Sequence, residues 1–92
     1  MARTEHDSLG RVDVPDDALW GAQTERARHH FHIGDGCMPM AVIHALGLVK
    51  AAAAEVNGRL GLIPAERAEA IGAAALEVAG GTLDAHFPLP VW

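Results

Sequence analysis

The sequence predicts a mainly α-helical domain in which a short amino-terminal β-hairpin precedes three helices. Half of the 92 residues are apolar but only 4% are aromatic. Alanine, a strong helix former, supplies much of the apolar content. Long stretches also repeat apolar residues at helical spacing, between prolines and glycines that mark helix ends. We expect one domain with segments at residues 1–15, 16–31, 39–60, 64–80 and 81–92.

Residues 1–15 are expected to be extended and to form the hairpin. Residues 11–14 alternate polar and apolar side chains, which is the period of a strand. Gly10 can adopt a positive φ and suits a turn, so residues 4–7 would pair with 11–14 until Pro15 ends the second strand. Because two strands alone are marginally stable in water, we expect them to pack on a helix.

Residues 16–31 are expected to hold the first helix, from about Asp17 to His30. Asp16 or Asp17 would cap its free N–H groups, and acidic side chains suit the positive end of the helix dipole. Gly21 inside this helix would cost up to about 1 kcal/mol relative to alanine. We therefore interpret Gly21 as a bend or a point of close backbone approach.

Residues 39–60 form the second predicted helix, with Pro39 at its start and Gly61 just beyond its end. Its apolar residues step by four and three positions, the spacing of a helix that packs along another helix. The alanines at 51–54 would let a neighbouring helix come close. The residues of this apolar seam are Val42, Leu46, Val49, Ala53, Val56 and Leu60.

Residues 64–80 form the third predicted helix, which starts at Pro64 and stops at a pair of glycines. Residues 81–92 form a tail, predicted to be extended because two closely spaced prolines exclude a helix. A folded domain seldom exposes several large apolar side chains together, so we expect this tail to be truncated chain. The apolar side chains of the tail are Phe87, Leu89, Val91 and Trp92.

Charge and cysteine content argue against several classes of protein. The net charge is −5, and the seven basic residues are scattered, which disfavours nucleic-acid binding. Cys37 is the single cysteine, so no internal disulfide forms, as is typical of a reducing compartment. No apolar run approaches the roughly 20 residues of a membrane span, and no signal peptide is evident. We expect a cytoplasmic protein that binds neither nucleic acid nor membrane.

Histidines are the most suggestive group for chemistry. His29, His30 and His32 cluster, and Cys37 and His44 follow, so a transition-metal site is one hypothesis. The spacing disfavours this hypothesis, because adjacent helical residues point about 100° apart. No histidine pair has the i, i+4 spacing of a helical metal site either. We favour a solvated helix end, where histidine suits the negative end of the dipole.

Other candidate groups have structural explanations. Cys37 as a nucleophile would need His32 or His44 as its base, but a lone cysteine in a loop is more often structural. Two carboxylate pairs lie in first turns of predicted helices, where capping and solvation explain them. We predict no catalytic, substrate-binding, cofactor-binding or metal-binding residue in this chain, and no cofactor. The carboxylate pairs are Asp16 with Asp17 and Glu66 with Glu69.

Several stretches resemble the amino-terminal part of class II fumarate hydratases. Residues 14–26 match the run V-P-x-D-x-L-W-G-A-Q-T-x-R of that family. Residues 3–10 resemble R-x-E-x-D-x-x-G, and residues 38–53 resemble the helix M-P-x-x-x-I-x-A-L-x-x-x-K-x-A-A-A. Residues 83–92 resemble L-D-D-x-F-P-L-x-x-W. The order and spacing of these motifs are kept over nearly the whole chain.

The resemblance implies the amino-terminal domain of a helical enzyme of the fumarase/aspartase type. It implies reversible hydration of fumarate to (S)-malate in the tricarboxylic acid cycle, without a metal or cofactor, in a homotetramer. The partners it implies are the remainder of the lyase chain and a dicarboxylate substrate. The substrate-binding Gly-Ser-Gly-Thr run of the family follows the position of Trp92, and its catalytic histidine and serine loop come later. This segment alone is therefore expected to be inactive.

Two alternatives stay open from the sequence. Aspartate ammonia-lyase belongs to the same superfamily, but its members usually have Tyr-Gly where this chain has Trp20 and Gly21. They also tend to have Phe where Trp92 stands. The second alternative is a non-catalytic interaction module whose apolar seam docks a partner helix.

Overall fold

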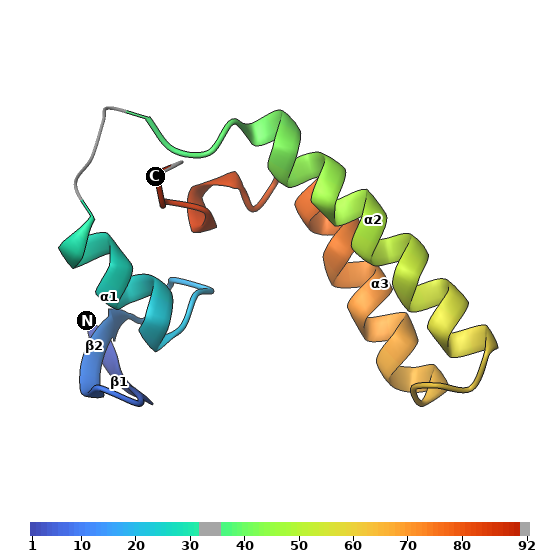
Figure 1. The fold of residues 1–92 in the computed structure, drawn as a ribbon, viewed down its shortest axis with the longest axis horizontal. Helices are drawn as coiled ribbons and strands as arrows, with labels where there is room; N and C mark the ends of the chain where they lie inside the picture. Colours follow the sequence, from blue (N-terminus) through green and yellow to red (C-terminus); the bar gives the residue numbers. More distant parts are fainter. Residues whose placement is uncertain (32–35, 91–92) are drawn as a thin grey trace. The chain divides into compact units, whose positions relative to one another are not determined.

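The computed structural model describes residues 1–31 and 36–90. In these residues it contains two strands, three α-helices and one short 3₁₀-helix, which confirms the predicted fold class (Figure 1). The chain divides into two compact units. The first unit comprises Met1–Met38 and Ala85–Trp92, and the second comprises Pro39–Asp84.

Strands β1 (Ala2–Asp7) and β2 (Gly10–Pro15) form the predicted hairpin in the first unit. They pair antiparallel, with Ala2 opposite Pro15 and Asp7 opposite Gly10, so the ladder includes the predicted pairs. Gly10 has φ 116°, a conformation that favours glycine and lets the turn close. Val14 is fully buried on the side that packs against α1, as expected for a hairpin that needs a helix.

Helix α1 (Ala22–His30) begins later than the helix predicted over residues 16–31. Gly21 is its N-cap, with extended φ and ψ of −106° and −159°, and no side chain caps the helix. The capping role predicted for Asp16 or Asp17 is therefore wrong. A Cβ on Gly21 would meet nothing within 4 Å, so the predicted close approach at this glycine is also wrong.

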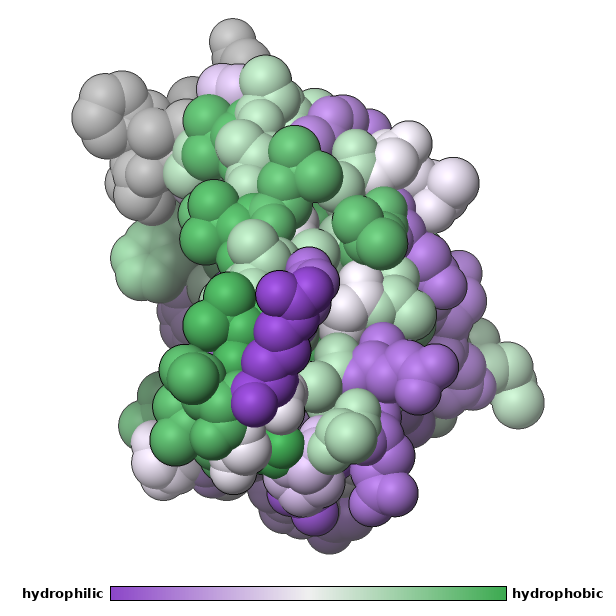
Figure 2. Space-filling model, turned by 90° about the vertical axis from the view of Figure 1, so that its right-hand side faces the viewer, coloured by the Kyte–Doolittle hydropathy of each residue, from purple (hydrophilic) through white to green (hydrophobic). Residues whose placement is uncertain are grey.

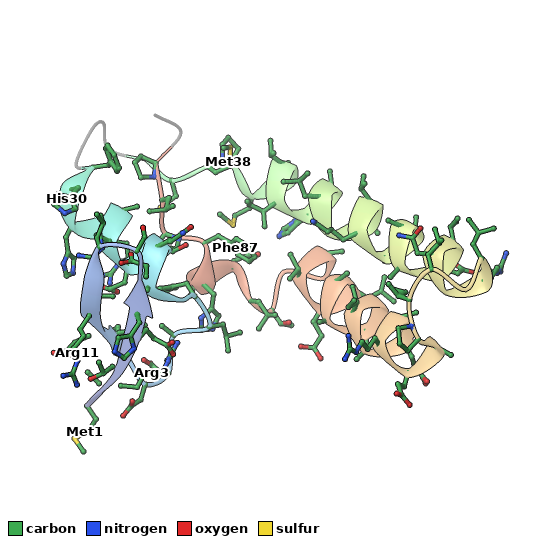
Figure 3. All side chains as sticks on the ribbon, turned by 60° about the horizontal axis from the view of Figure 1, so that its bottom comes forward. Met1, Arg3, Arg11, His30, Met38 and Phe87 are labelled. Atoms are coloured by element: carbon green, nitrogen blue, oxygen red, sulfur yellow. The ribbon has the colours of Figure 1, made fainter. Side chains whose placement is uncertain are left out.

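Arg3 gives the physical reason for the late start of α1. A helix from residue 17 would need the carbonyls there to accept N–H groups four residues ahead. Instead, Arg3 Nη1 donates to the carbonyls of Pro15 (2.9 Å) and Ala18 (3.0 Å), and Nη2 donates to the carbonyl of Trp20 (2.7 Å). One guanidinium, labelled in Figure 3, thus organises the turn that replaces the first part of the predicted helix.

Helices α2 (Met40–Arg59) and α3 (Ala65–Ala79) form an antiparallel hairpin in the second unit (Figure 1). They agree with the second and third predicted helices to within one residue at each end. Pro39 and Pro64 stand immediately before the first helical residues. Gly61 has φ 72° in the loop between the helices, consistent with its predicted place just after the end of α2.

Small residues bring α2 and α3 into close contact. A Cβ on Gly47 would lie only 2.8 Å from the carbonyl oxygen of Ala75 on α3. A Cβ on Gly58 would lie 2.7 Å from the Cβ of Ala68. Between these glycines, Ala54 is buried (4% exposed), as expected for an alanine where a neighbouring helix comes close. Glycine at 47 and 58 is therefore required by the separation of the two helices.

The apolar seam of α2 does not make this contact. Its five large side chains are exposed by 44% to 66%, and its alanine is exposed as well. The prediction that the seam packs along another helix is not met by α3, because the glycines and alanines on a different face allow a closer approach. The large seam residues are Val42, Leu46, Val49, Val56 and Leu60.

The tail over residues 81–92 is not wholly extended as predicted. It contains the 3₁₀-helix η1 (Asp84–His86). Beyond it, the chain returns along the residues before α2: the N–H of Met38 donates to the carbonyl of Leu89 (3.1 Å). Leu89 is half-buried, so this part of the tail is less exposed than predicted. Val91 and Trp92 lie outside the described residues.

Helix α2 also corrects the expectation that no apolar segment has the length of a membrane span. Its 20 residues include an 18-residue window of mean hydropathy 1.3, of which 17% is buried. By length and composition, this helix in the described chain would be able to cross a membrane. A core helix of a water-soluble enzyme meets the same criteria, so the finding is weak evidence for a span.

Candidate functional site

A buried carboxylate lies at the centre of a polar cluster on α1. Glu25 is 2% exposed and accepts hydrogen bonds from Trp20 Nε1 (3.0 Å) and from Arg28 Nη1 (2.5 and 2.6 Å to its two oxygens). His29 Nε2 lies 3.2 Å from the same carboxylate. The guanidinium of Arg28 lies over the Trp20 ring, 5.0 Å from its centroid. We call Trp20, Glu25, Arg28 and His29 the Glu25 cluster.

The helical spacing of α1 explains how the Glu25 cluster forms. Residues three and four positions apart lie on one face of a helix, which places Arg28 and His29 beside Glu25. Trp20 reaches the carboxylate from the turn that Arg3 organises, because the carbonyl of Trp20 is one of the Arg3 acceptors. The ring of His86 lies 6.1 Å from that of Trp20, and its Nδ1 accepts the N–H of Leu19 (3.1 Å).

The electrostatics of the cluster favour a structural role. Burial raises the pKa of Glu25. The hydrogen bonds from Arg28 and Trp20, together with the charges of Arg28 and His29, lower the pKa by more than burial raises it, so it lies below its ordinary value. A general base needs a pKa near the working pH and a free lone pair facing substrate. Glu25 has neither property, because it is ionised, buried and already occupied by its neighbours.

A second ion pair joins the hairpin turn to α1. Arg26 binds Asp7 through two hydrogen bonds of 2.9 Å each. The hydrogen bond from Arg26 lowers the pKa of Asp7, and the same bond raises the pKa of Arg26. An open groove of about 680 Å³ runs beside this pair. Its lining residues are Asp7, Ser8, Leu9, Gln23, Arg26, Ala27, His30 and Phe31.

The second unit holds a histidine–aspartate pair. His44 Nε2 on α2 lies 2.7 Å from Asp84 Oδ1 at the start of η1. Gly81 has φ 88°, and a Cβ there would lie 3.5 Å from His44 Nε2, so the glycine lets the chain pass close to the ring. Catalytic dyads pair such a histidine with a nucleophile. In the described part of this unit no hydroxyl or thiol bonds to His44, and the Thr82 hydroxyl donates to the Glu77 carbonyl.

The histidine and cysteine residues considered for a metal site have separate surroundings. His29 belongs to the Glu25 cluster, and His30 is exposed at the end of α1. Cys37 donates to the carbonyl of Pro88 (3.3 Å) and is exposed, while His44 pairs with Asp84. His32 lies outside the described residues. Among the residues described, no three His, Cys, Asp or Glu side chains are grouped to hold a metal ion.

Sequence reasoning did not find the role of Glu25 or of Arg3. The spacing of Glu25, Arg28 and His29 was a visible signal for the first, since it places opposite charges on one helix face. Arg3 gave no such signal, because its acceptors are backbone carbonyls 12 to 17 residues away.

The chain is similar to known lyases along nearly its whole length. A family model described as lyase matches residues 10–92. A class II fumarate hydratase of Pseudomonas aeruginosa is 60% identical over 92 residues, which are 100% of this chain and 20% of the relative. A second, from Bradyrhizobium diazoefficiens, is 58% identical over 90 residues, which are 98% of this chain and 19% of the relative.

Solved structures of this group have the same fold. A class II fumarase from Schistosoma mansoni matches with a TM-score of 0.93 at 36% identity, over 100% of this chain and 20% of that one. A fumarate lyase/delta crystallin from Brucella melitensis, solved bound to cobalt, matches with a TM-score of 0.90 at 40% identity. That match covers 99% of this chain and 20% of the other.

The family match defines the class of protein: the chain belongs to the lyase family. Its β-hairpin and its α2–α3 hairpin are the elements of the fold shared with the solved lyases. Within that family, the particular proteins it is similar to are class II fumarate hydratases. The resemblance inferred from residues 14–26 is thereby confirmed. The chain spans about a fifth of the length of the curated relatives it matches.

Proposed function

We propose that these residues form the amino-terminal part of a fumarate hydratase, which catalyses the reversible hydration of fumarate to (S)-malate in the tricarboxylic acid cycle. The observation that carries the proposal is 60% identity to a class II fumarate hydratase along the full 92 residues. The TM-score of 0.93 to a class II fumarase supports it independently of the motifs.

These residues are expected to be inactive on their own. Hydration of a double bond needs a base free to move a proton and a pocket that holds both carboxylates of the substrate. Three arginines of the first unit that would otherwise be able to bind carboxylates are engaged elsewhere: Arg28 with Glu25, Arg26 with Asp7 and Arg3 with backbone carbonyls. We therefore assign no catalytic or substrate-binding residue to this part of the chain.

The remainder of the lyase chain is the main partner in this proposal, together with a dicarboxylate substrate. We place the complete enzyme in the cytoplasm as a homotetramer that needs no cofactor and binds neither nucleic acid nor membrane. The net charge of −5 argues against nucleic-acid binding, and the other points are expected from the similarity to class II fumarate hydratases. For α2, packing against α3 and the rest of a lyase accounts for its apolar composition without a membrane.

Aspartate ammonia-lyase is the second candidate function. Against it, Trp20 stands where members of that family usually have tyrosine, and its indole N–H donates to the buried Glu25. The curated relatives named above are also fumarate hydratases.

The test is an assay of the full-length protein that contains these residues. With malate as substrate, the ultraviolet absorbance of fumarate is expected to rise, and with aspartate no ammonia should be released. Ammonia release would instead assign aspartate ammonia-lyase. The purified 92-residue chain should turn over neither substrate. Turnover by that chain would refute the assignment of the chemistry to the remaining sequence.

A further inference from the structure

Helix α2 presents two different apolar faces. One face packs on α3 through Gly47, Ala54 and Gly58. The other is the apolar seam, which lies roughly 140° around the helix axis from the first face at about 100° per residue. Val49, in the middle of the seam, is 64% exposed. The charged residues of α2 are Lys50, Glu55 and Arg59, and none of them belongs to the seam.

A surface of this kind is unusual for a folded protein in water. Five large aliphatic side chains follow one line along a 20-residue helix. Contiguous apolar patches larger than a few hundred Å² normally mark an interface. A helix that is apolar around most of its circumference is normally covered on more than one side. Viewed from the side on which the α2–α3 loop lies in Figure 1, hydrophobic residues cover much of the surface (Figure 2).

The spacing of the seam favours an α-helix as the structure that would cover it. Steps of four, three, four, three and four residues keep the side chains on one narrow stripe, which suits another α-helix lying lengthwise. A strand or a small ligand would not need this period over five turns. Lys50 flanks the seam and belongs to no ion pair among the described residues, so it is available to a carboxylate on a covering helix.

We propose that the apolar seam is covered by a helix from the part of the lyase chain beyond these 92 residues. The inference rests on the proposed function, because it takes the covering helix from the longer chain of that enzyme. This chain spans only 20% of its class II fumarate hydratase relative, so about four-fifths of such a chain is available to supply the helix. The seam is then an internal surface, through which the α2–α3 hairpin packs against the rest of the enzyme.

The test compares two matched positions on α2 in the full-length protein. Val49 is 64% exposed on the seam, and Glu55 is 63% exposed on a different face. Each is replaced by cysteine in a C37S background, because Cys37 is itself exposed. The rate of maleimide labelling is then measured at each site by peptide mass spectrometry. Val49→Cys should react at least about 100-fold more slowly than Glu55→Cys, because its labelling requires local opening.

Equal labelling rates at the two sites would overturn the proposal. If Val49→Cys labels slowly only until the assembly is diluted to single chains, the proposal is overturned in favour of a second copy as the cover. Protection that appears only with lipid vesicles would overturn it in favour of a membrane. Fumarate hydratase activity is measured on the same samples. An active enzyme with equal rates refutes only this inference, and a protected but inactive protein refutes only the proposed activity.

Discussion

Each of the two units of this chain is stabilised internally by a different kind of interaction. The first unit depends on charged side chains: Arg3 on backbone carbonyls, Arg26 on Asp7, and the buried Glu25 with its cluster. The second depends on small residues that let two helix backbones approach closely. The first unit should therefore be sensitive to loss of charge, whereas the second should be sensitive to added volume.

The largest effect is expected from added volume in the second unit. Gly47→Ala places a Cβ 2.8 Å from a backbone oxygen of α3, where neither backbone can move freely. We expect the free energy of unfolding to fall by about 2–3 kcal/mol, as for overpacked interiors. Urea denaturation followed by circular dichroism measures the change.

Gly72→Ala is the matched control for Gly47→Ala. A Cβ on Gly72, also within a helix, would meet nothing within 4 Å. Alanine should therefore stabilise α3 by about 0.5–1 kcal/mol through its higher helix propensity. If both substitutions changed the free energy of unfolding in the same direction, the assignment of close packing to Gly47 would be contradicted.

A smaller loss is expected from removal of Arg3 in the first unit. Arg3→Met keeps a long apolar stem but leaves the carbonyls of Pro15, Ala18 and Trp20 without their charged donor. Because Arg3 is partly exposed and water can reach some of these groups, we expect a loss of about 2 kcal/mol. Urea denaturation measures this loss, and the backbone amide chemical shifts of the turn before α1 should also change in the Arg3→Met variant.

Arg59→Met is the control for Arg3→Met. Arg59 pairs with Glu55 on the surface of α2, with side-chain exposures of 76% and 63%. Exposed pairs contribute little, so this variant should stay within about 0.5 kcal/mol of the original protein. An equal loss for both arginines would show that charge in general, and not the Arg3 contacts, stabilises the fold.

The smallest effect is expected from mild acid. The pKa values of Glu25 and Asp7 lie below their ordinary values of 4.5 and 3.8. A lowered pKa in the folded state gives stability that is present above the ordinary value and is lost as pH falls through the folded pKa. Hydrogen exchange should therefore show amides of α1 losing protection below about pH 4.5, before those of α2 and α3. Simultaneous loss in all three helices would contradict separate stabilisation of the units.

The contrast between the units also explains which features the sequence could predict. Proline before each helix and glycine after it located α2 and α3 to within one residue. Alternation and Gly10 located the hairpin. These signals are local, so they can be read from short stretches of chain. The family motifs were equally readable, because they are strings of consecutive residues.

Other features depend on contacts that a one-dimensional pattern does not contain. The true start of α1 is set by Arg3, whose acceptors follow 12 to 17 residues later. The periodicity of α2 marked the seam as an apolar face, but backbone separation from α3 decided which face packs, and Gly47 set that separation. For the Glu25 cluster, the spacing was visible, but one donor to the carboxylate, the indole N–H of Trp20, comes from outside the helix.

The first unit is discontinuous in sequence, since it combines Met1–Met38 with Ala85–Trp92. The Arg3 contacts span at most 17 residues and can close as soon as Trp20 has been synthesised. The bonds from Leu19 to His86 and from Met38 to Leu89 span 67 and 51 residues, so they must wait until the whole α2–α3 hairpin has left the ribosome. During synthesis, the residues of the turn around Arg3 can therefore come together first, and Trp20 meets the ring of His86 only after the α2–α3 hairpin has been made.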